Sequence, residues 1–143
     1  MQELLGSQLF TKDGLIPISE LSKYKYVLLY FSAHWCPPCR GFTPKLSMFY
    51  DSVNEDGKQV EVVFVSADRT PEQFNEYFDE MDWVAVPYTE TARRAQLAQR
   101  FKIQGLPVLF LLDKDGNMVR DTCRMDVTSR GPTCLTDWDS ALN

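Results

Sequence analysis

Two cysteines separated by two prolines, within residues 35–40 (WCPPCR), constrain this chain more than any other feature. An apolar run at residues 26–31 precedes them, and a helical pattern begins near Pro37, where proline suits the first turn because its missing N–H has no intrahelical partner there. Unpaired backbone N–H groups and the positive end of the helix dipole favour a thiolate at such a position. The first cysteine of such motifs commonly has a lowered pKa, and the thiolate is the nucleophile of disulfide exchange. We therefore interpret Cys36 as the attacking thiolate and Cys39 as the resolving thiol.

Two other interpretations of the cysteine pair are zinc binding and a purely structural disulfide. Zinc usually takes four ligands in a recognisable spacing, and the other candidates here are His34, Cys123 and Cys134. The last two are eleven residues apart, and His34 lies two residues before Cys36, where sharing a metal is awkward. The order strand, Cys-x-x-Cys, helix favours redox chemistry over both interpretations, so we expect no metal.

Length and composition limit the remaining classes. With 143 residues, the chain is the size of one domain, 1–143, and long enough to bury a core. A net charge of −5 without a basic cluster argues against nucleic-acid binding. No apolar run approaches the ~20 residues of a membrane span, and the N-terminus lacks a charged region followed by an apolar one. Four cysteines do not make a disulfide scaffold, so we expect a reducing, cytoplasmic setting, with the nucleus as an alternative.

Apolar periodicity and turn residues predict an α/β fold. The expected elements are a hairpin within 4–18, a helical turn at 19–21, a strand at 24–31, a helix over 37–54 kinked at Pro44, a strand at 60–65, a helix from 71 capped by Thr70, an irregular apolar connection at 81–88, a helix capped by Thr89 or Thr91 and running through 101, and a final hairpin of strands 109–112 and 118–119. This order predicts a central mixed β-sheet flanked by helices on both faces, with an N-terminal β-hairpin extension. The tail from about residue 123 is poorly patterned and is expected to be loop with at most one short helix.

Three segments carry a family resemblance. Residues 30–44 (YFSAHWCPPCRGFTP) resemble the active-site region of the tryparedoxin and nucleoredoxin branch of the thioredoxin superfamily. Residues 83–88 (WVAVPY) resemble that branch's Trp-Leu-Ala-Val/Leu-Pro-Phe segment, and residues 105–108 (GLPV) resemble the Gly-Ile-Pro-Thr segment that carries the superfamily's cis-proline. The three segments occur in the family's order, and the resemblance covers roughly residues 5–138.

The resemblance implies a thioredoxin fold with a reversible dithiol–disulfide cycle at Cys36 and Cys39 and no bound cofactor. It places a cis Pro107 against Cys36, with the Leu106 backbone presented to an extended substrate; the alternative is an ordinary proline at the start of a strand. Trp35 is expected to shield one side of the disulfide, with plain core packing as the alternative. The further supporting residues that the resemblance implies are Pro37, Pro38, Arg40 and Arg124.

Departures from the tryparedoxin pattern bear on the substrate. Ala67 stands where tryparedoxins carry a tryptophan, Asp68 is kept, and Arg69 replaces the next acidic residue. Losing the aromatic face and reversing one charge weakens binding of a cationic polyamine such as the arm of trypanothione. Arg124 aligns with an arginine that helps tryparedoxins hold glutathione-like carboxylates. These features favour a nucleoredoxin-like protein.

Thioredoxin itself has a buried aspartate six residues before the nucleophile, and Tyr30 holds that place here. The carboxylate that accepts the proton of the resolving thiol is therefore missing at this position. A tyrosine hydroxyl, a water molecule or another carboxylate remain as alternatives.

The sequence thus predicts a thiol–disulfide oxidoreductase that reduces protein disulfides, a peroxiredoxin among the candidate substrates, with glutathione or a low-molecular-weight dithiol as reductant. The alternatives are a redox-switched protein-binding module, a true trypanothione-dependent tryparedoxin, and a membrane-tethered reductase, against which residues 83–88 and the lack of an anchor argue. We expect a monomer. A catalytic role for His34 is disfavoured because neighbours in an extended segment point apart. Cys123 and Cys134 are expected to be bystanders, with a second disulfide or a redox sensor as the alternatives.

Overall fold

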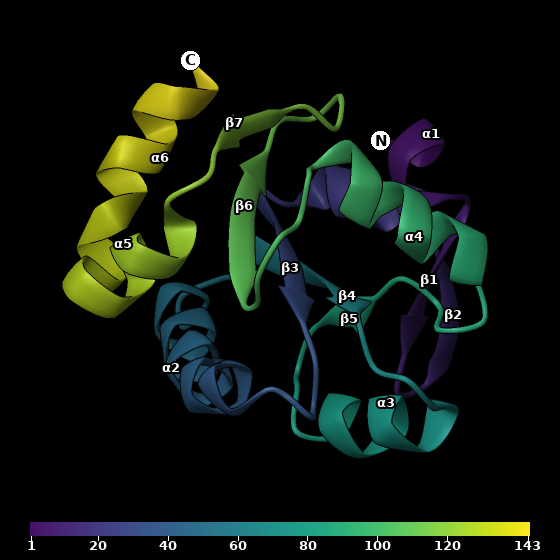
Figure 1. Cartoon of the computed structure of the whole chain (residues 1–143). Coiled ribbons are helices and arrows are strands. Elements are labelled where there is room, and N and C mark those ends of the chain that lie inside the picture. The colour runs from purple at the N-terminus through teal and green to yellow at the C-terminus, as the bar shows by residue number, and fades with distance from the viewer.

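A seven-stranded sheet organises the computed structural model, which describes residues 1–143 (Figure 1). The strands are β1 (Gln8–Thr11), β2 (Gly14–Pro17), β3 (Tyr26–Ser32), β4 (Val60–Ser66), β5 (Val84–Ala85), β6 (Val108–Leu112) and β7 (Met118–Arg120). Their order across the sheet is β2-β1-β5-β4-β3-β6-β7. Strand β3 pairs in parallel with β4 and antiparallel with β6, so the sheet is mixed, as the sequence predicts.

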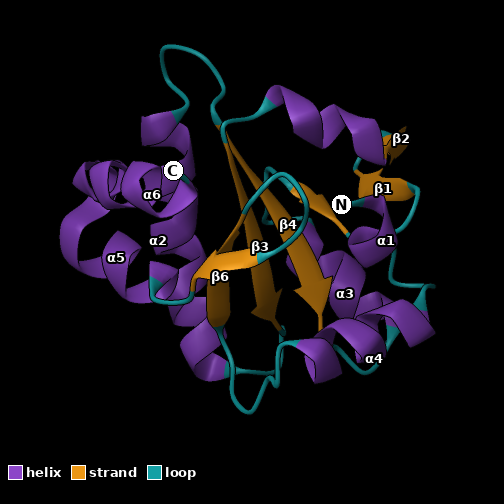
Figure 2. Ribbon diagram, turned by 90° about the horizontal axis from the view of Figure 1, so that it is seen from above, coloured by secondary structure: helices purple, strands orange, loops and turns teal.

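Helices cover both faces of this sheet. They are α1 (Gln2–Leu5), the 3-10 helix η1 (Ile18–Lys23), α2 (Pro37–Val53), α3 (Pro71–Phe78), α4 (Thr91–Arg100), α5 (Cys123–Arg130), the 3-10 helix η2 (Gly131–Cys134) and α6 (Leu135–Leu142). Figure 2 shows β3, β4 and β6 running between α2, α5 and α6 on one side and α1 and α4 on the other. Every residue of β3 and β4 is buried, because a strand covered on both faces is a near-continuous apolar run.

The N-terminal hairpin and the helix after the cysteine motif are confirmed. Strands β1 and β2 pair antiparallel, and α2 begins at Pro37 and continues through Pro44. The Thr70 hydroxyl accepts a hydrogen bond from Gln73 N at 3.1 Å and caps α3 as expected. For α4 the expected cap is wrong, because Glu90 holds the N-cap position and makes no side-chain capping bond.

The connection at residues 81–88 was expected to be irregular, and the structure corrects this. It contains β5, which pairs in parallel with β4 and antiparallel with β1. This short strand joins the N-terminal hairpin to the main sheet, a pairing of distant segments that local patterning does not reveal. Helix α1 was likewise not expected; its Leu4 and Leu5 are buried against the face that carries α4.

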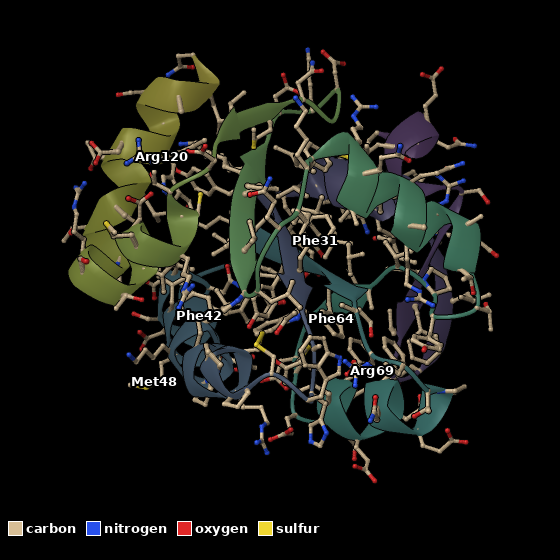
Figure 3. All side chains as sticks on the ribbon, viewed as in Figure 1. Phe31, Phe42, Met48, Phe64, Arg69 and Arg120 are labelled. Carbon is tan, nitrogen blue, oxygen red and sulfur yellow. A yellow bond between two sulfur atoms is a disulfide. The ribbon has the colours of Figure 1, made fainter.

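The expectation of a loop-like tail is wrong, since α5, η2 and α6 follow one another without a gap over residues 123–142. The buried tail residues that hold these helices against the core are Cys123, Val127, Cys134 and Trp138. Asp126 accepts hydrogen bonds from Arg120 at 2.7 and 3.1 Å and from Trp138 Nε1 at 2.9 Å, which ties α5 to β7 and α6. Figure 3 shows Arg120 beside these helices. Tertiary packing, and not local propensity, thus stabilises the tail. No helix of the chain is long and apolar enough to cross a membrane.

Candidate active site

The two motif cysteines form a disulfide at the N-terminus of α2, a few residues after the end of β3. Cys36 is the N-cap residue of α2, with extended backbone angles, and Cys39 lies in the first turn, 5.2 Å away between Cα atoms. Cys39 N donates to Cys36 Sγ at 3.4 Å. Pro37 and Pro38 occupy the first helical positions and bring no N–H that needs a partner. A thiolate on Cys36 therefore faces a backbone donor at the positive end of a helix.

The two sulfur positions differ in accessibility. Cys36 keeps 6% of its surface exposed, whereas Cys39 has none. On the side away from α2, Cys36 Sγ lies 3.8 Å from the carbonyl oxygen of Leu106, and the Leu106–Pro107 peptide bond is cis. Arg124 Nη1 donates to the Pro107 carbonyl at 3.4 Å. The fold therefore assembles the site from three separate segments of the chain.

Trp35 forms one edge of the site and is 42% exposed. Its Nε1 donates to the Ala67 carbonyl at 3.0 Å, which fixes the indole against the loop after β4. The guanidinium of Arg69 lies 4.8 Å from the indole ring centroid. The indole is thus held in place on one edge and covered by a cation on one face.

Asp68 holds the segment that precedes the disulfide. Its buried carboxylate accepts hydrogen bonds from His34 N and from Ser66 Oγ, each at 2.7 Å. The His34 ring instead packs toward Tyr77, with 5.7 Å between ring centroids. Sequence reasoning placed Asp68 only in a substrate-docking position and missed this positioning role. The signal available was a serine two residues before an aspartate at a strand end, which forms a local side-chain bond.

A chain of four buried hydroxyls lies beneath the disulfide. Tyr30 Oη is 2.7 Å and Tyr77 Oη is 2.5 Å from Thr43 Oγ1, and Ser32 Oγ is 2.6 Å from Tyr77 Oη. Thr43 Oγ1 also lies 3.0 Å from the Cys39 carbonyl, to which it must donate its single proton. Both tyrosines therefore donate to Thr43, and Ser32 donates to Tyr77. All four hydroxyl protons are used, and the chain ends at the backbone of the buried cysteine.

Burial raises the pKa of Tyr30 well above its ordinary value. The phenol that stands where thioredoxin has an aspartate therefore stays protonated at neutral pH. It serves as a hydrogen-bond donor to Thr43, and an anionic base at this position is absent.

The side chains of the other candidate residues make no hydrogen bond to the disulfide. Arg40 is exposed on α2, and its side chain makes no hydrogen bond or ion pair. Cys123 and Cys134 are unpaired, buried thiols in the core beneath α5 and η2. Burial raises the pKa of both, that of Cys134 to about 12, so neither resembles a reactive thiolate. No group of three or more His, Cys, Asp or Glu side chains is placed to hold a metal ion.

The fold and the site together define the class of thioredoxin-like redox proteins. One mixed sheet carries a strand that leads to the cysteine pair at a helix N-terminus, and a cis-proline lies opposite that pair. A family model described as "Thioredoxin-like" matches residues 24–118. Tryparedoxin I from Crithidia fasciculata superposes with a TM-score of 0.83 at 36% identity, covering 90% of each chain, so the thioredoxin fold is confirmed.

Two sequence relatives identify the branch of this class to which the chain belongs. Nucleoredoxin from Danio rerio is 49% identical over 136 residues, which are 95% of this chain and 32% of that protein. Tryparedoxin from Trypanosoma brucei brucei is 36% identical over 117 residues, which are 82% of this chain and 80% of that protein. The chain belongs to the tryparedoxin and nucleoredoxin branch of the thioredoxin superfamily. It spans about a third of the length of the nucleoredoxins that it matches.

Proposed function

We propose that the chain is a thiol–disulfide oxidoreductase that reduces disulfides in proteins. The observation that carries this proposal is the asymmetry of the pair: Cys36 borders the surface at a helix N-terminus, and Cys39 is fully buried behind it. This is the arrangement needed for one cysteine to engage a protein and the other to release it.

The reaction balances with two cysteines and a substrate disulfide. The Cys36 thiolate attacks one substrate sulfur, a Cys36–substrate disulfide forms, and the other substrate sulfur leaves as a thiolate. The Cys39 thiolate then attacks Cys36 Sγ, the substrate leaves as a dithiol, and the Cys36–Cys39 disulfide remains. Two electrons have passed to the substrate, so no bound cofactor is required. Two molecules of glutathione, or one molecule of a low-molecular-weight dithiol, then return two electrons to the pair and leave as a disulfide.

The neighbouring residues have supporting roles in this proposal. The carbonyl oxygen of Leu106 lies 3.8 Å from Cys36 Sγ, and the next peptide bond, to Pro107, is cis. The backbone of Leu106 supplies main-chain hydrogen bonds to an extended substrate. Trp35 shields the disulfide and offers a flat apolar contact. Pro37 and Pro38 shape the helix start, while Arg40 and Arg124 add positive charge near it.

The charge at the site favours one candidate reductant, glutathione, over another, trypanothione. One solved tryparedoxin II is complexed with glutathionylspermidine, whose polyamine arm is cationic. In this chain Arg69 stands over Trp35, and Ala67 provides only its carbonyl. Repulsion between Arg69 and a polyamine favours glutathione or another donor over trypanothione. We further propose a monomeric, single-domain unit over 1–143 that acts in the cytoplasm, or alternatively the nucleus, on substrates that include peroxiredoxins.

Reduction of insulin or a peroxiredoxin, with glutathione and trypanothione supplied in turn, tests the proposal. We expect turnover with glutathione, its loss in Cys36→Ser, and a trapped mixed disulfide with Cys39→Ser, while Cys134→Ala serves as the matched control. Turnover with trypanothione alone would make the chain a trypanothione-dependent tryparedoxin. Absence of turnover with every donor, although Cys36 and Cys39 still cycle, would replace the proposal with a redox-switched binding module.

A further inference from the structure

Cations without ion-pair partners border the disulfide of a chain whose net charge is −5. Arg69 lies on the Trp35 side, and Arg124 and Lys45 lie on the α2–α5 side. None of the three takes part in an intramolecular ion pair. The cations that do are Lys23, Lys25, Lys58, Arg93, Arg120 and Arg130. Figure 3 shows Arg69 where the chain passes from β4 toward α3.

Arg69 is held in position without being neutralised. Its guanidinium stacks over the Trp35 ring at 4.8 Å, and its backbone N donates to Gln73 Oε1 at 3.0 Å. The adjacent carboxylate of Asp68 is buried and already accepts from His34 N and Ser66 Oγ. The N–H groups at the edge of the stacked guanidinium therefore remain available for a carboxylate, which arginine binds in a bidentate manner.

A second cationic surface lies across the disulfide from Arg69. Arg124 and Lys45 line a hollow of about 520 Å³ between α2 and α5, whose lining includes Pro38 of the cysteine motif. The bond from Arg124 to the Pro107 carbonyl is long, at 3.4 Å, and leaves most guanidinium donors free. Arg40 also has no ion-pair partner, but it lines a separate hollow, which Glu80 shares. A polypeptide that crosses Cys36 thus passes between positive charge on both sides.

We propose that this rim selects substrate segments that carry acidic residues next to the target cysteine, with Arg69 stacked on Trp35 as the main determinant. The inference rests on the proposed function and names the chemistry of its protein substrate. Each exposed pair contributes little, so we expect about a fivefold preference in kcat/KM for an acidic over a basic segment at low salt. The preference falls at high ionic strength, where the Debye length shrinks to about 3 Å at 1 M.

The test uses three disulfide peptides that differ only at the residues flanking the cysteine: glutamate, lysine or glutamine. Flanking charge also alters the exchange chemistry itself, so each enzymatic kcat/KM is divided by the rate of the same peptide with dithiothreitol, an uncharged dithiol. Arg69→Gln and Arg69→Glu change the proposed determinant. Lys114→Glu is the matched control, because it is exposed in the turn between β6 and β7, at the far end of β6 from Pro107.

We expect the glutamate peptide to be preferred by the unaltered protein and by Lys114→Glu, the preference to drop below about twofold in Arg69→Gln, and the order to invert in Arg69→Glu. Equal normalised rates for the three peptides would overturn the inference and leave the proposed function standing. A preference that survives Arg69→Gln would also overturn it. If no peptide, including the glutamine one, is reduced, the proposed function fails, and the inference fails with it.

Discussion

Thr43 connects the hydroxyl chain beneath the disulfide. We expect removal of its hydroxyl to leave a buried tyrosine hydroxyl without a hydrogen-bond acceptor. The substitution Thr43→Val keeps the shape of the side chain and deletes Oγ1. Both phenols then lose the oxygen that accepts their protons, but Tyr77 can turn its proton to Ser32 Oγ at 2.6 Å, whereas Tyr30 has no other hydrogen-bond partner. Because Tyr30 is fully buried, no water replaces the lost acceptor.

The loss in the free energy of unfolding depends on which buried hydrogen-bonding groups each substitution leaves without a partner. An unsatisfied buried donor costs about 1–3 kcal/mol, so Thr43→Val should lower the free energy of unfolding by about 2 kcal/mol. Tyr30→Phe leaves Thr43 with Tyr77 as donor and the Cys39 carbonyl as acceptor, so about 1 kcal/mol is expected. In the double variant the Tyr30 hydroxyl is absent, so it is not left without an acceptor. Its cost should therefore fall below the sum of the single costs by about 1 kcal/mol or more.

Urea denaturation of the four proteins measures this coupling. Tyr50→Phe supplies the control, because the Tyr50 hydroxyl lies in the same core but donates to Glu61 at 3.0 Å. The combination of Thr43→Val with Tyr50→Phe should be additive to within about 0.5 kcal/mol. Additive behaviour of Thr43→Val with Tyr30→Phe would refute the assignment of donors in the chain.

Two further predictions concern the tail helices. Hydrogen bonds from Arg120 hold the pKa of Asp126 below its ordinary value, so its contribution to stability is present above the unfolded-state pKa of about 3.9 and is lost as pH falls through the lower folded-state pKa. Asp126→Asn should cost about 2–4 kcal/mol at pH 7 and progressively less below about pH 4, measured by urea denaturation against exposed Asp51→Asn. In the reduced native protein, iodoacetamide at neutral pH should label Cys36, with Cys123 and Cys134 labelled only after unfolding, because burial raises their pKa values; comparable labelling of all three in a native peptide map would contradict this.

The sequence predicts most of the sheet and the helix at the site because these elements have strong local patterns. The runs that become β3 and β4 are apolar throughout, and Pro37 marks the start of α2. The tail was mispredicted for the opposite reason. Its helices depend on Trp138 entering the core and on Asp126 meeting Arg120, neither of which a local window contains.

The same reasoning explains which parts of the site escaped prediction. The cysteine pair is visible as a motif, but the contact of Asp68 with His34 N spans 34 residues and that of Thr43 with Tyr77 also spans 34. His34 and Asp68 meet because β3 and β4 run in parallel and end together, with Ser32 opposite Ser66, and Thr43 and Tyr77 lie in the helices that follow these two strands. Carboxyl ends of parallel strands meet at one edge of a sheet, so topology, once known, brings them together.

The segment after β4 performs two separable tasks. Toward the interior, Asp68 binds the backbone before the disulfide; toward the solvent, the next residue, Arg69, covers Trp35. Adjacent residues in an extended segment point to opposite sides, so a charge change at Arg69 leaves the bonds of Asp68 untouched. Proteins of this fold can therefore change the charge they present to a partner at this position while the geometry of the cysteine pair stays fixed.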